Sequence, residues 1–268
     1  MRGCPVRSPI TAPMFASSRA SALGFVDEQA LSFNGVFDYM VLPIEASDLL
    51  RSDRAFSIGL YMAWHWQNDS VVLLSTMPTA EEDPTRHGFV LSVNLASGPE
   101  FGRFHCRFEG DVPAGQRARA LGSSVFGWTA RPAVTFLLTY DGSGSAAGFQ
   151  LYVNGVPDNM SVVEDTLTGP VISYKRPNVA GNPGSGAIFR PTMDASQLIL
   201  CDRALTQIEA IEHHNGIAGD PRNSQFGAAV RHWWPIGEGD VLPWLDDRIS
   251  GLQAEAIGFT ASGFVAKE

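Results

Sequence analysis

Apolar and polar residues alternate through residues 133–156, and this pattern constrains the fold more than any other stretch of the chain. A period of two is typical of a half-buried β-strand, and Asn-Gly is typical of a tight turn between strands. The sequence Asp-Gly-Ser-Gly-Ser interrupts the alternation at residues 141–145, and Asn154-Gly155 follows it. The stretch therefore predicts two strands and a tight turn into a third, in the middle of an all-β domain. The alternating apolar residues are Val134, Phe136, Leu138, Tyr140, Phe149, Leu151 and Val153.

The same alternation recurs along most of the chain. It predicts strands over residues 55–66, 88–95 and 103–109 and around Leu198 and Leu200. Apolar residues also alternate on both sides of Asn34-Gly35, which predicts a hairpin there. One short helix is expected, since Thr206 and Glu209 have the spacing of a capping box and Gly216 can end the helix.

Composition excludes several classes of partner. The 268 residues carry a formal charge of −9 and a pI near 5.1, so no global basic field attracts nucleic acid or an anionic membrane. No apolar run approaches the roughly 18 residues that a membrane-spanning helix needs, and we expect no membrane insertion. The three cysteines, Cys4, Cys106 and Cys201, form neither a complete disulfide set nor a zinc-binding pair, which favours folding in a reducing cytoplasm.

Both ends of the chain differ from its middle. Residues 1–28 contain Pro5, Pro9 and Pro13, show little periodicity and lack the apolar core of a secretory signal, so we expect an extended arm. Such an arm either hangs free or docks on a neighbouring protein. Residues 29–216 form the predicted domain. Residues 217–268 are expected to be an extension that packs on this domain or on a neighbouring subunit. The long loops at 79–86 and 168–193 are expected to carry function.

Several segments resemble laminin-G-like domains of the concanavalin A-like superfamily. They are Tyr140-Asp-Gly with Leu151-Tyr-Val-Asn-Gly, the strand that begins Phe56-Ser-Ile-Gly-Leu-Tyr-Met, and the unit Arg203-Ala-Leu-Thr-x-x-Glu. Residues 233–247 resemble the C-terminal segment of laminin-G-like proteins encoded by tailed phages. The resemblance implies an all-β fold, a concanavalin A-like jelly-roll β-sandwich with one short helix over residues 29–216.

Enzymatic chemistry is not visible in the sequence. Jelly-roll relatives that cleave glycans place three carboxylates on one strand face, and the partial matches at Glu81-Glu-Asp, Glu109-Gly-Asp and Glu238-Gly-Asp each lack the third. No Gly-x-Ser-x-Gly nucleophile turn is present. We therefore expect a protein that is not an enzyme, and we name no catalytic residue.

Three residues are candidates for ligand binding. Tyr61 and His65 lie on the face of their strand opposite Ile58 and Leu60, and Trp234 is adjacent to Trp233, so that one of the two rings should be exposed or covered by a partner if the segment is extended. Tryptophan and tyrosine rings are suited to stacking on sugars.

Two further features leave alternatives open. Arg103, His105 and Arg107 share one strand face, which is either a solvated outer face or a contact with a ligand or subunit. His213 and His214 are expected to be cations at the helix end, favoured by the helix dipole.

Calcium is the one cofactor that the resemblance suggests, because many laminin-G-like folds bind it through Asp or Asn side chains. The acidic residue usual in the closing strand aligns with Ser196 here. Only Asp194 can substitute for it, with Asp38 or Asp27 as its partner; the alternative is that these aspartates form turns.

These observations predict a non-catalytic structural and recognition protein of a phage virion, namely a capsid decoration, fibre or tail component that binds host glycan. Its expected partners are other virion proteins, through the N-terminal arm, further copies of itself and a host surface glycan. It would be made in the host cytoplasm and would reside on the virion surface. The alternative function is that of a glycan-processing enzyme or its accessory carbohydrate-binding domain.

Overall fold

The computed structural model describes residues 28–65, 70–78, 82, 85–94, 99–125, 131–181, 190–216, 219–237, 239–260 and 262–267, with the backbone alone at 64, 131 and 132. The expected arm at residues 1–28 therefore lies, except for Glu28, outside the described residues. So do Asp27, Glu81 and Glu238. No helix in the described ranges is long and apolar enough to cross a membrane.

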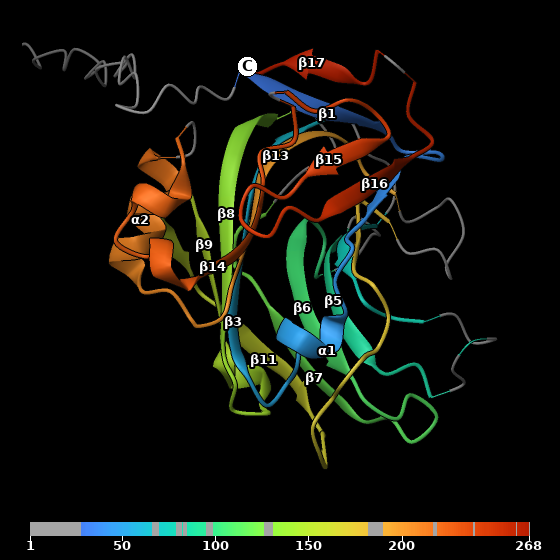
Figure 1. Ribbon diagram of the computed structural model, residues 1–268. Coiled ribbons are helices and arrows are strands. Elements are labelled where there is room, and N and C mark those ends of the chain that lie inside the picture. The colour runs from blue at the N-terminus through green and yellow to red at the C-terminus, as the bar shows by residue number, and fades with distance from the viewer. Residues whose placement is uncertain are drawn as a thin grey trace, which may run out of the picture.

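Two antiparallel sheets make up the protein (Figure 1). The first has eight strands, of which seven follow one another across the sheet and the eighth, β14 (Val230–Trp234), pairs with β13. The order of the seven is β10 (Val156–Asp158), β9 (Phe149–Val153), β8 (Arg131–Asp141), β3 (Ala55–Trp64), β13 (Thr192–Cys201), β1 (Gln29–Asn34) and β17 (Phe264–Ala266).

The second sheet has nine strands. Their order is β11 (Ser161–Asp165), β7 (Arg117–Leu121), β6 (Arg103–Glu109), β5 (Gly88–Asn94), β4 (Val71–Ser75), β12 (Asn178–Val179), β2 (Tyr39–Val41), β16 (Gln253–Ile257) and β15 (Trp244–Asp246). The strands predicted at 133–156, 55–66, 88–95 and 103–109 are thus present and fall into both sheets. The all-β prediction is confirmed.

Aromatic side chains from the two sheets meet in the core. Phe108 of the nine-stranded sheet lies 5.0 Å, between ring centroids, from Tyr140 of the other sheet and 5.4 Å from Phe149. Phe56 and Phe89 join this group at 5.5 Å from each other. Alternation along each strand places these rings on the inner face, so the period read from the sequence defines the core.

A second apolar layer covers the outer face of the eight-stranded sheet. It is built by helix α2 (Gln207–Asn215) and the turns η3 (Pro221–Asn223) and η4 (Gly227–Ala229), and Figure 1 shows α2 beside β8, β9 and β14. Phe226 from this layer and Trp233 from β14 are buried with Leu137, Tyr152 and Ile199 of the sheet. This sheet is therefore buried on both faces over much of its area.

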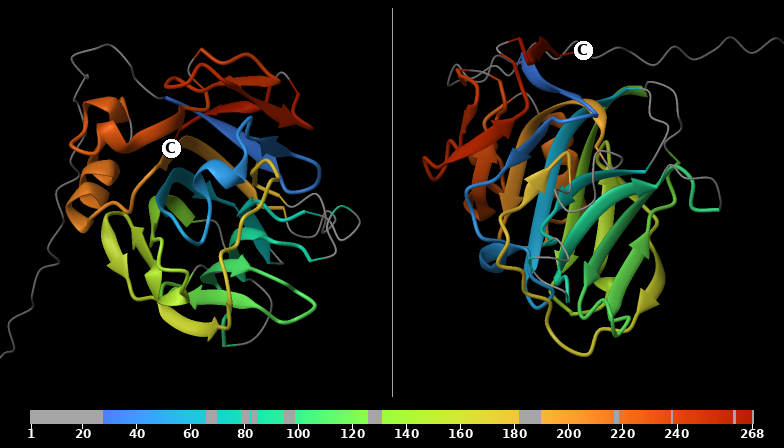
Figure 2. Two further views of the ribbon diagram at one scale, coloured as in Figure 1. Left: turned by 60° about the horizontal axis from the view of Figure 1, so that its bottom comes forward. Right: turned by 90° about the vertical axis from the view of Figure 1, so that its right-hand side faces the viewer.

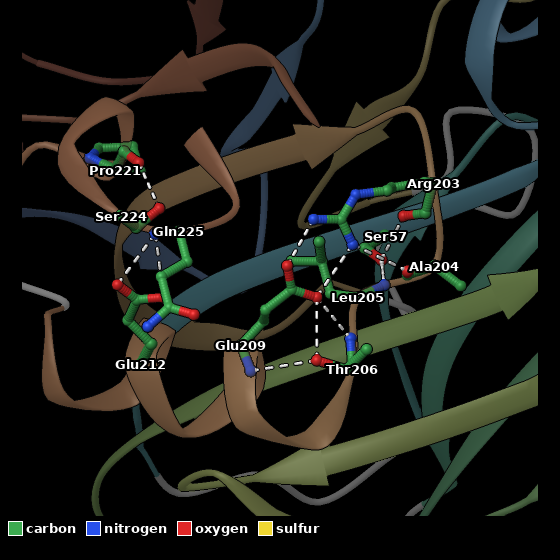
Figure 3. Close-up of polar contacts among 10 residues, drawn as sticks. All are labelled: Ser57, Arg203, Ala204, Leu205, Thr206, Glu209, Glu212, Pro221, Ser224 and Gln225. Carbon is green, nitrogen blue, oxygen red and sulfur yellow. Dashed lines mark hydrogen bonds and ion pairs between the residues drawn. The ribbon is translucent and has the colours of Figure 1, made fainter. Parts of the chain in front are cut away.

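The start of α2 is held by side-chain hydrogen bonds (Figure 3). The Thr206 hydroxyl accepts from the Glu209 amide at 3.4 Å, and the Glu209 carboxylate accepts from the Thr206 amide at 2.8 Å, which confirms the capping box. Arg203 also binds Glu209 and lowers the pKa of that carboxyl to about 2. The buried Ser57 hydroxyl donates to the Arg203 carbonyl at 2.8 Å and accepts from the Leu205 amide at 2.9 Å, which ties the helix to β3.

The Asn34-Gly35 turn does not form the predicted hairpin. β1 belongs to the eight-stranded sheet and β2 to the nine-stranded sheet, so the turn is a corner between the sheets. Asn34 Oδ1 accepts from the amides of Val36 and Phe37 at 2.8 and 3.1 Å, and Asp38 Oδ2 accepts from the Asn34 amide at 2.9 Å. Because these side chains close the turn, it needs no pairing between the two strands.

The sheets do not stop at residue 216. The segment 217–268 supplies four strands: β14 and β17 extend the eight-stranded sheet, and β15 and β16 form one edge of the nine-stranded sheet. Figure 2 shows the red strands β15, β16 and β17 on the same side of the molecule as the blue β1, with which β17 pairs. The C-terminal segment is thus part of the sandwich.

The two helix-end histidines are not cations, which corrects the sequence interpretation. His213 is buried against β3, where Gly59 leaves room for its ring: a Cβ at Gly59 would lie 2.7 Å from His213 Nε2. Burial lowers the pKa of His213 to about 4. Burial also lowers the pKa of His214, whose Nδ1 lies 2.8 Å from the Thr135 hydroxyl.

The buried His213 should make stability fall in mild acid. The pKa is about 4 in the folded chain and about 6.5 in the unfolded chain, so below pH 6.5 the unfolded state binds the proton and gains stability. Between pH 7 and pH 5 this one group should cost about 2 kcal/mol of unfolding free energy. Urea unfolding of the wild type and of His213→Gln at both pH values measures it. Equal pH dependence in the two proteins would contradict the assignment.

Candidate functional site: a polar groove on the nine-stranded sheet

A groove of about 450 Å³ lies on the outer face of β4, β5, β6, β7 and β11. The inner face of β4, β5, β6 and β7 is apolar and buried, so every second residue of these four strands points outward. The strand register places Ser92 opposite His105, and Arg107 opposite both Val90 and Arg119. The lining comprises Ser70, Val71, Val72, Met77, Arg86, Ser92, Val93, Asn94, His105, Arg107, Glu109, Val112, Arg117, Arg119 and Glu164.

One end of the groove contains a network of ion pairs around Glu109. The buried Glu109 carboxylate accepts from Arg117 Nε at 2.7 Å, and its other oxygen lies 2.9 Å from Arg107 Nε. Glu164 lies 3.8 Å from a terminal nitrogen of Arg117. Burial lowers the pKa of Arg107, whereas the hydrogen bond to Glu109 raises the pKa of Arg117. The two guanidinium groups therefore share one buried carboxylate.

The other end is built around His105. Its Nδ1 lies 3.1 Å from a terminal nitrogen of Arg119, which also binds Glu100. A guanidinium can only donate, so Nδ1 accepts and the imidazole proton resides on Nε2. Burial, together with Arg119, lowers the pKa of His105 to about 4 and keeps the ring neutral at pH 7. Asn94 and Ser70 complete this end with a hydrogen bond of 2.9 Å.

The shared face predicted for Arg103, His105 and Arg107 is present. It is not simply a solvated face, because His105 is buried and both His105 and Arg107 line the groove. Arg103 lies on the same strand face outside the lining. The outer face of β6 is therefore concave and partly buried at His105 and Arg107.

Tyr61 is on the outer face of β3 as predicted, and His65 directly follows this strand, but Tyr61 does not lie on an open surface. Its side chain is 9% exposed, and the Nζ atom of Lys267 lies 4.4 Å from the centre of its ring. The C-terminal segment covers this part of the sheet, which the sequence alone did not indicate. His65 Nε2 lies 3.1 Å from Asp194 Oδ2, so His65 pairs with Asp194. Neither residue belongs to the groove lining.

Trp234 is fully buried, which corrects its assignment as a ligand-binding residue. Trp233 and Trp234 do point to opposite faces of β14, as predicted: Trp234 packs in the core between the sheets, and Trp233 packs in the layer under α2. Both faces of β14 are covered by the chain itself. Neither ring is therefore available to stack on a sugar.

The two proposed calcium ligands that the structure describes, Asp38 and Asp194, each contact another residue of the chain. Asp38 Oδ2 accepts the Asn34 amide, and Asp194 Oδ2 contacts His65. The Oδ1 atom of each is buried and has no hydrogen-bond partner among the described residues. However, no group of three or more His, Cys, Asp or Glu side chains in the described ranges could hold a metal ion. Asp38 acts as a turn-forming aspartate, the alternative interpretation of the sequence.

Sequence reasoning missed β7, one of the strands that line the groove. Residues 110–132 resemble a Gly-, Pro- and Arg-rich connection, yet β7 forms within them and contributes Arg117 and Arg119. The signal was the alternation Arg117-Ala-Arg-Ala-Leu121, in which the small Ala118 and Ala120 face the core. Alanine is a weak marker of a buried strand face, so the period was easy to overlook. The loop at 79–86 contributes Arg86 to the groove.

Comparisons with known proteins identify the fold. No protein-family model matches the chain, and no curated protein matches its sequence. Among solved structures, a Bacteroides ovatus protein named as a candidate carbohydrate binder has a TM-score of 0.57 and 15% identity over 91% of this chain and 61% of its own. This chain thus spans about three-fifths of that protein's length.

A second similar structure is the heptameric SAP-like pentraxin of Limulus polyphemus, with a TM-score of 0.50 and 12% identity over 88% of this chain and 98% of its own. At such low identities the likeness shows the fold alone. Together with the two packed antiparallel sheets, it shows that the chain is a jelly-roll β-sandwich with a concanavalin A-like fold.

Proposed function

We propose that this chain is a non-catalytic recognition protein that binds a glycan in the polar groove. The observation that carries the proposal is the groove itself, where hydroxyl, amide and guanidinium groups converge on the outer face of the nine-stranded sheet. The outer face of the eight-stranded sheet is instead partly covered by α2. Sugars are bound by such planar and polar groups placed in a concave site. The Bacteroides ovatus protein with a similar fold, named as a candidate carbohydrate binder, supports the same function.

The absence of catalysis is part of this proposal. A glycosidase needs one carboxyl group as a general acid and a second as nucleophile or base. Of the two carboxylates in the groove lining, Glu109 is buried and already bound to two guanidinium groups, which leaves it poorly suited to either role.

A groove-filling variant tests the proposal. Ser92 belongs to the lining, and Ser92→Trp should lower the affinity for any glycan found on an array by about tenfold or more, measured by titration calorimetry. The control is Ser262→Trp, on an exposed position away from the lining, which should bind like the wild type. Equal affinities of the two variants would place binding elsewhere. Hydrolysis of a polysaccharide panel that is abolished by Glu109→Gln would support the enzyme alternative instead.

We further propose that the protein works on the surface of a phage virion, as a decoration, fibre or tail component that recognises host glycan. The resemblance of residues 233–247 to phage-encoded laminin-G-like proteins supports this setting. Oligomerisation and docking of the 1–28 arm on other virion proteins belong to the same proposal. Mass spectrometry of purified virions tests it, and the protein should be present at a stoichiometric copy number.

A further inference from the structure

The groove has a local charge opposite to that of the whole protein. Its lining holds four arginines, Arg86, Arg107, Arg117 and Arg119, and two glutamates, Glu109 and Glu164, in a chain with a formal charge of −9. His105 adds no charge at neutral pH because its pKa is about 4. The guanidinium groups therefore outnumber the carboxylates among the residues that line the groove.

The excess positive charge is concentrated at the end where Arg86 lies. Arg107 and Arg117 share Glu109, while Arg86 makes no hydrogen bond or ion pair with any residue in the described ranges, and its buried Nε has no hydrogen-bond partner there. The positive charge of Arg86 also contributes to the lowered pKa of Arg107. Two guanidinium groups that repel each other at a groove wall are stabilised when an anion lies between or beside them.

The backbone at Arg86 is held in an unusual conformation. Its φ angle is +57°, in the left-handed region that a residue with a side chain rarely adopts. Next to it the Thr85 carbonyl accepts from the Val112 amide at 3.1 Å, which links this loop to the turn that precedes β7. Strained residues of this kind are concentrated at ligand-binding sites, where the surrounding structure maintains them.

The opposite end of the groove suits uncharged groups. Arg119 is bound to Glu100, which neutralises it. Ser92 and Asn94 offer a hydroxyl and an amide. The buried His105 Nε2–H makes no hydrogen bond within the described part of the chain, and a carboxylate oxygen of Glu100 lies 3.6 Å from it. A neutral imidazole and side-chain amides are donors and acceptors for sugar hydroxyl groups.

We propose that the ligand of the groove is an acidic glycan whose anionic group, a carboxylate or a sulfate ester, binds at Arg86 and Arg107 while its neutral hydroxyl groups face Ser92, Asn94 and His105. This inference rests on the proposed function and narrows it to one chemical class of glycan. It rests on Arg86, the one arginine of the groove lining whose guanidinium group has no hydrogen bond or ion pair within the described ranges. It also rests on the change along the groove from charged side chains at one end to uncharged polar side chains at the other.

Two matched pairs of probes test the charge requirement. Tetragalacturonate is compared with its methyl ester, and dextran sulfate with dextran, by titration calorimetry. The acidic member of at least one pair should bind about tenfold or more tightly than its neutral counterpart, and its affinity should fall as sodium chloride is raised from about 50 to about 300 mM. The pair that shows the difference tells a carboxylate ligand from a sulfate ligand.

The residue at the anionic end is tested with Arg86→Gln. It should weaken binding of the acidic probe by about tenfold and leave the neutral counterpart unchanged. The matched control is Arg103→Gln, which removes an arginine from the same sheet outside the groove lining and should bind like the wild type. Arg86→Lys keeps the charge without the planar fork and should show an intermediate loss, which guards against a folding defect of the glutamine variant.

The outcomes separate this inference from the proposed function. If array glycans blocked by Ser92→Trp are neutral, or if neither acidic probe binds better than its neutral counterpart, the acidic-glycan inference is wrong and the groove remains a glycan site. If Ser92→Trp affects no glycan, the proposed function itself is wrong. If Arg86→Gln and Arg103→Gln weaken binding equally, the effect is general electrostatics, and the placement of the anion at Arg86 is overturned.

Discussion

Replacement of Phe108 by alanine is expected to lower the free energy of unfolding by about 3–5 kcal/mol. The Phe108 ring is fully buried and contacts rings from both sheets: Tyr140 at 5.0 Å and Phe149 at 5.4 Å in the eight-stranded sheet, and Phe89 at 5.3 Å in its own sheet, all between centroids. Removing it deletes apolar surface from the core and leaves a cavity that the rigid sheets on both sides cannot close. Urea denaturation followed by tryptophan fluorescence measures the loss.

Phe37→Ala is the matched control, because Phe37 is 66% exposed at the corner between β1 and β2. It should change the unfolding free energy by less than about 0.5 kcal/mol. A small effect of Phe108→Ala would mean that the two sheets do not pack through the aromatic group. A large effect of Phe37→Ala would mean that its ring is covered in solution.

Glu109→Gln is expected to have the second largest effect on stability, a loss of about 2–3 kcal/mol. Breaking a fully buried ion pair costs about 3–5 kcal/mol, and the partial exposure of Arg107 and Arg117 reduces that figure. The amide has the shape of the carboxylate but leaves two guanidinium groups close together without a counter-charge. Chemical denaturation at constant salt measures the change.

Two further variants make this result specific. Glu164→Gln removes a carboxylate 3.8 Å from Arg117 that is more exposed than Glu109, and it should cost less than about 0.5 kcal/mol. In a double-mutant cycle, Arg117→Leu should recover part of the loss caused by Glu109→Gln, because it removes one of the two unpaired cations. Strictly additive losses would show that Glu109 does not couple to Arg117.

The same residues thus set both the stability and the charge of the groove. Glu109 holds Arg107 and Arg117 in place, and Arg86 is left as the cation with no hydrogen bond or ion pair among the described residues. Variants that test recognition are therefore best made at Arg86 and Ser92, outside the Glu109 network, where a loss of affinity is separable from a loss of stability.

Local patterns predicted the strands well and their pairing poorly. The alternation at 133–156 gave β8, β9 and the turn into β10. The Asn34-Gly35 pair forms a turn, but the strands on its two sides enter different sheets. The side chains of Asn34 and Asp38 accept hydrogen bonds from backbone amides of the turn, so the turn forms without pairing between these strands. Strand pairing depends on contacts between residues far apart in the chain, which a short window does not contain.

The candidate site was predicted in part. The shared face of His105 and Arg107 followed from period two along one strand, and both residues line the groove. Arg117 was missed because its strand alternates with alanine. Trp234 was misassigned. The sequence shows that the adjacent rings of Trp233 and Trp234 point to opposite faces of their strand. It does not show that the core covers one of these faces and the layer under α2 covers the other.

The sequence by itself determined the all-β class, the inward-facing aromatic residues around Phe108 and Tyr140, and the capped helix α2, because each depends on spacing within a few residues. Only the tertiary structure decided where a ligand can bind. The C-terminal segment, folded back as β14 to β17, places its own Trp234 in the core and covers Tyr61, and α2 covers part of the outer face of the eight-stranded sheet. The groove of Arg86, His105 and Arg107 lies on the outer face of the other sheet. Which strand face stays open is set by long-range packing, and so the site could be read only from the folded chain.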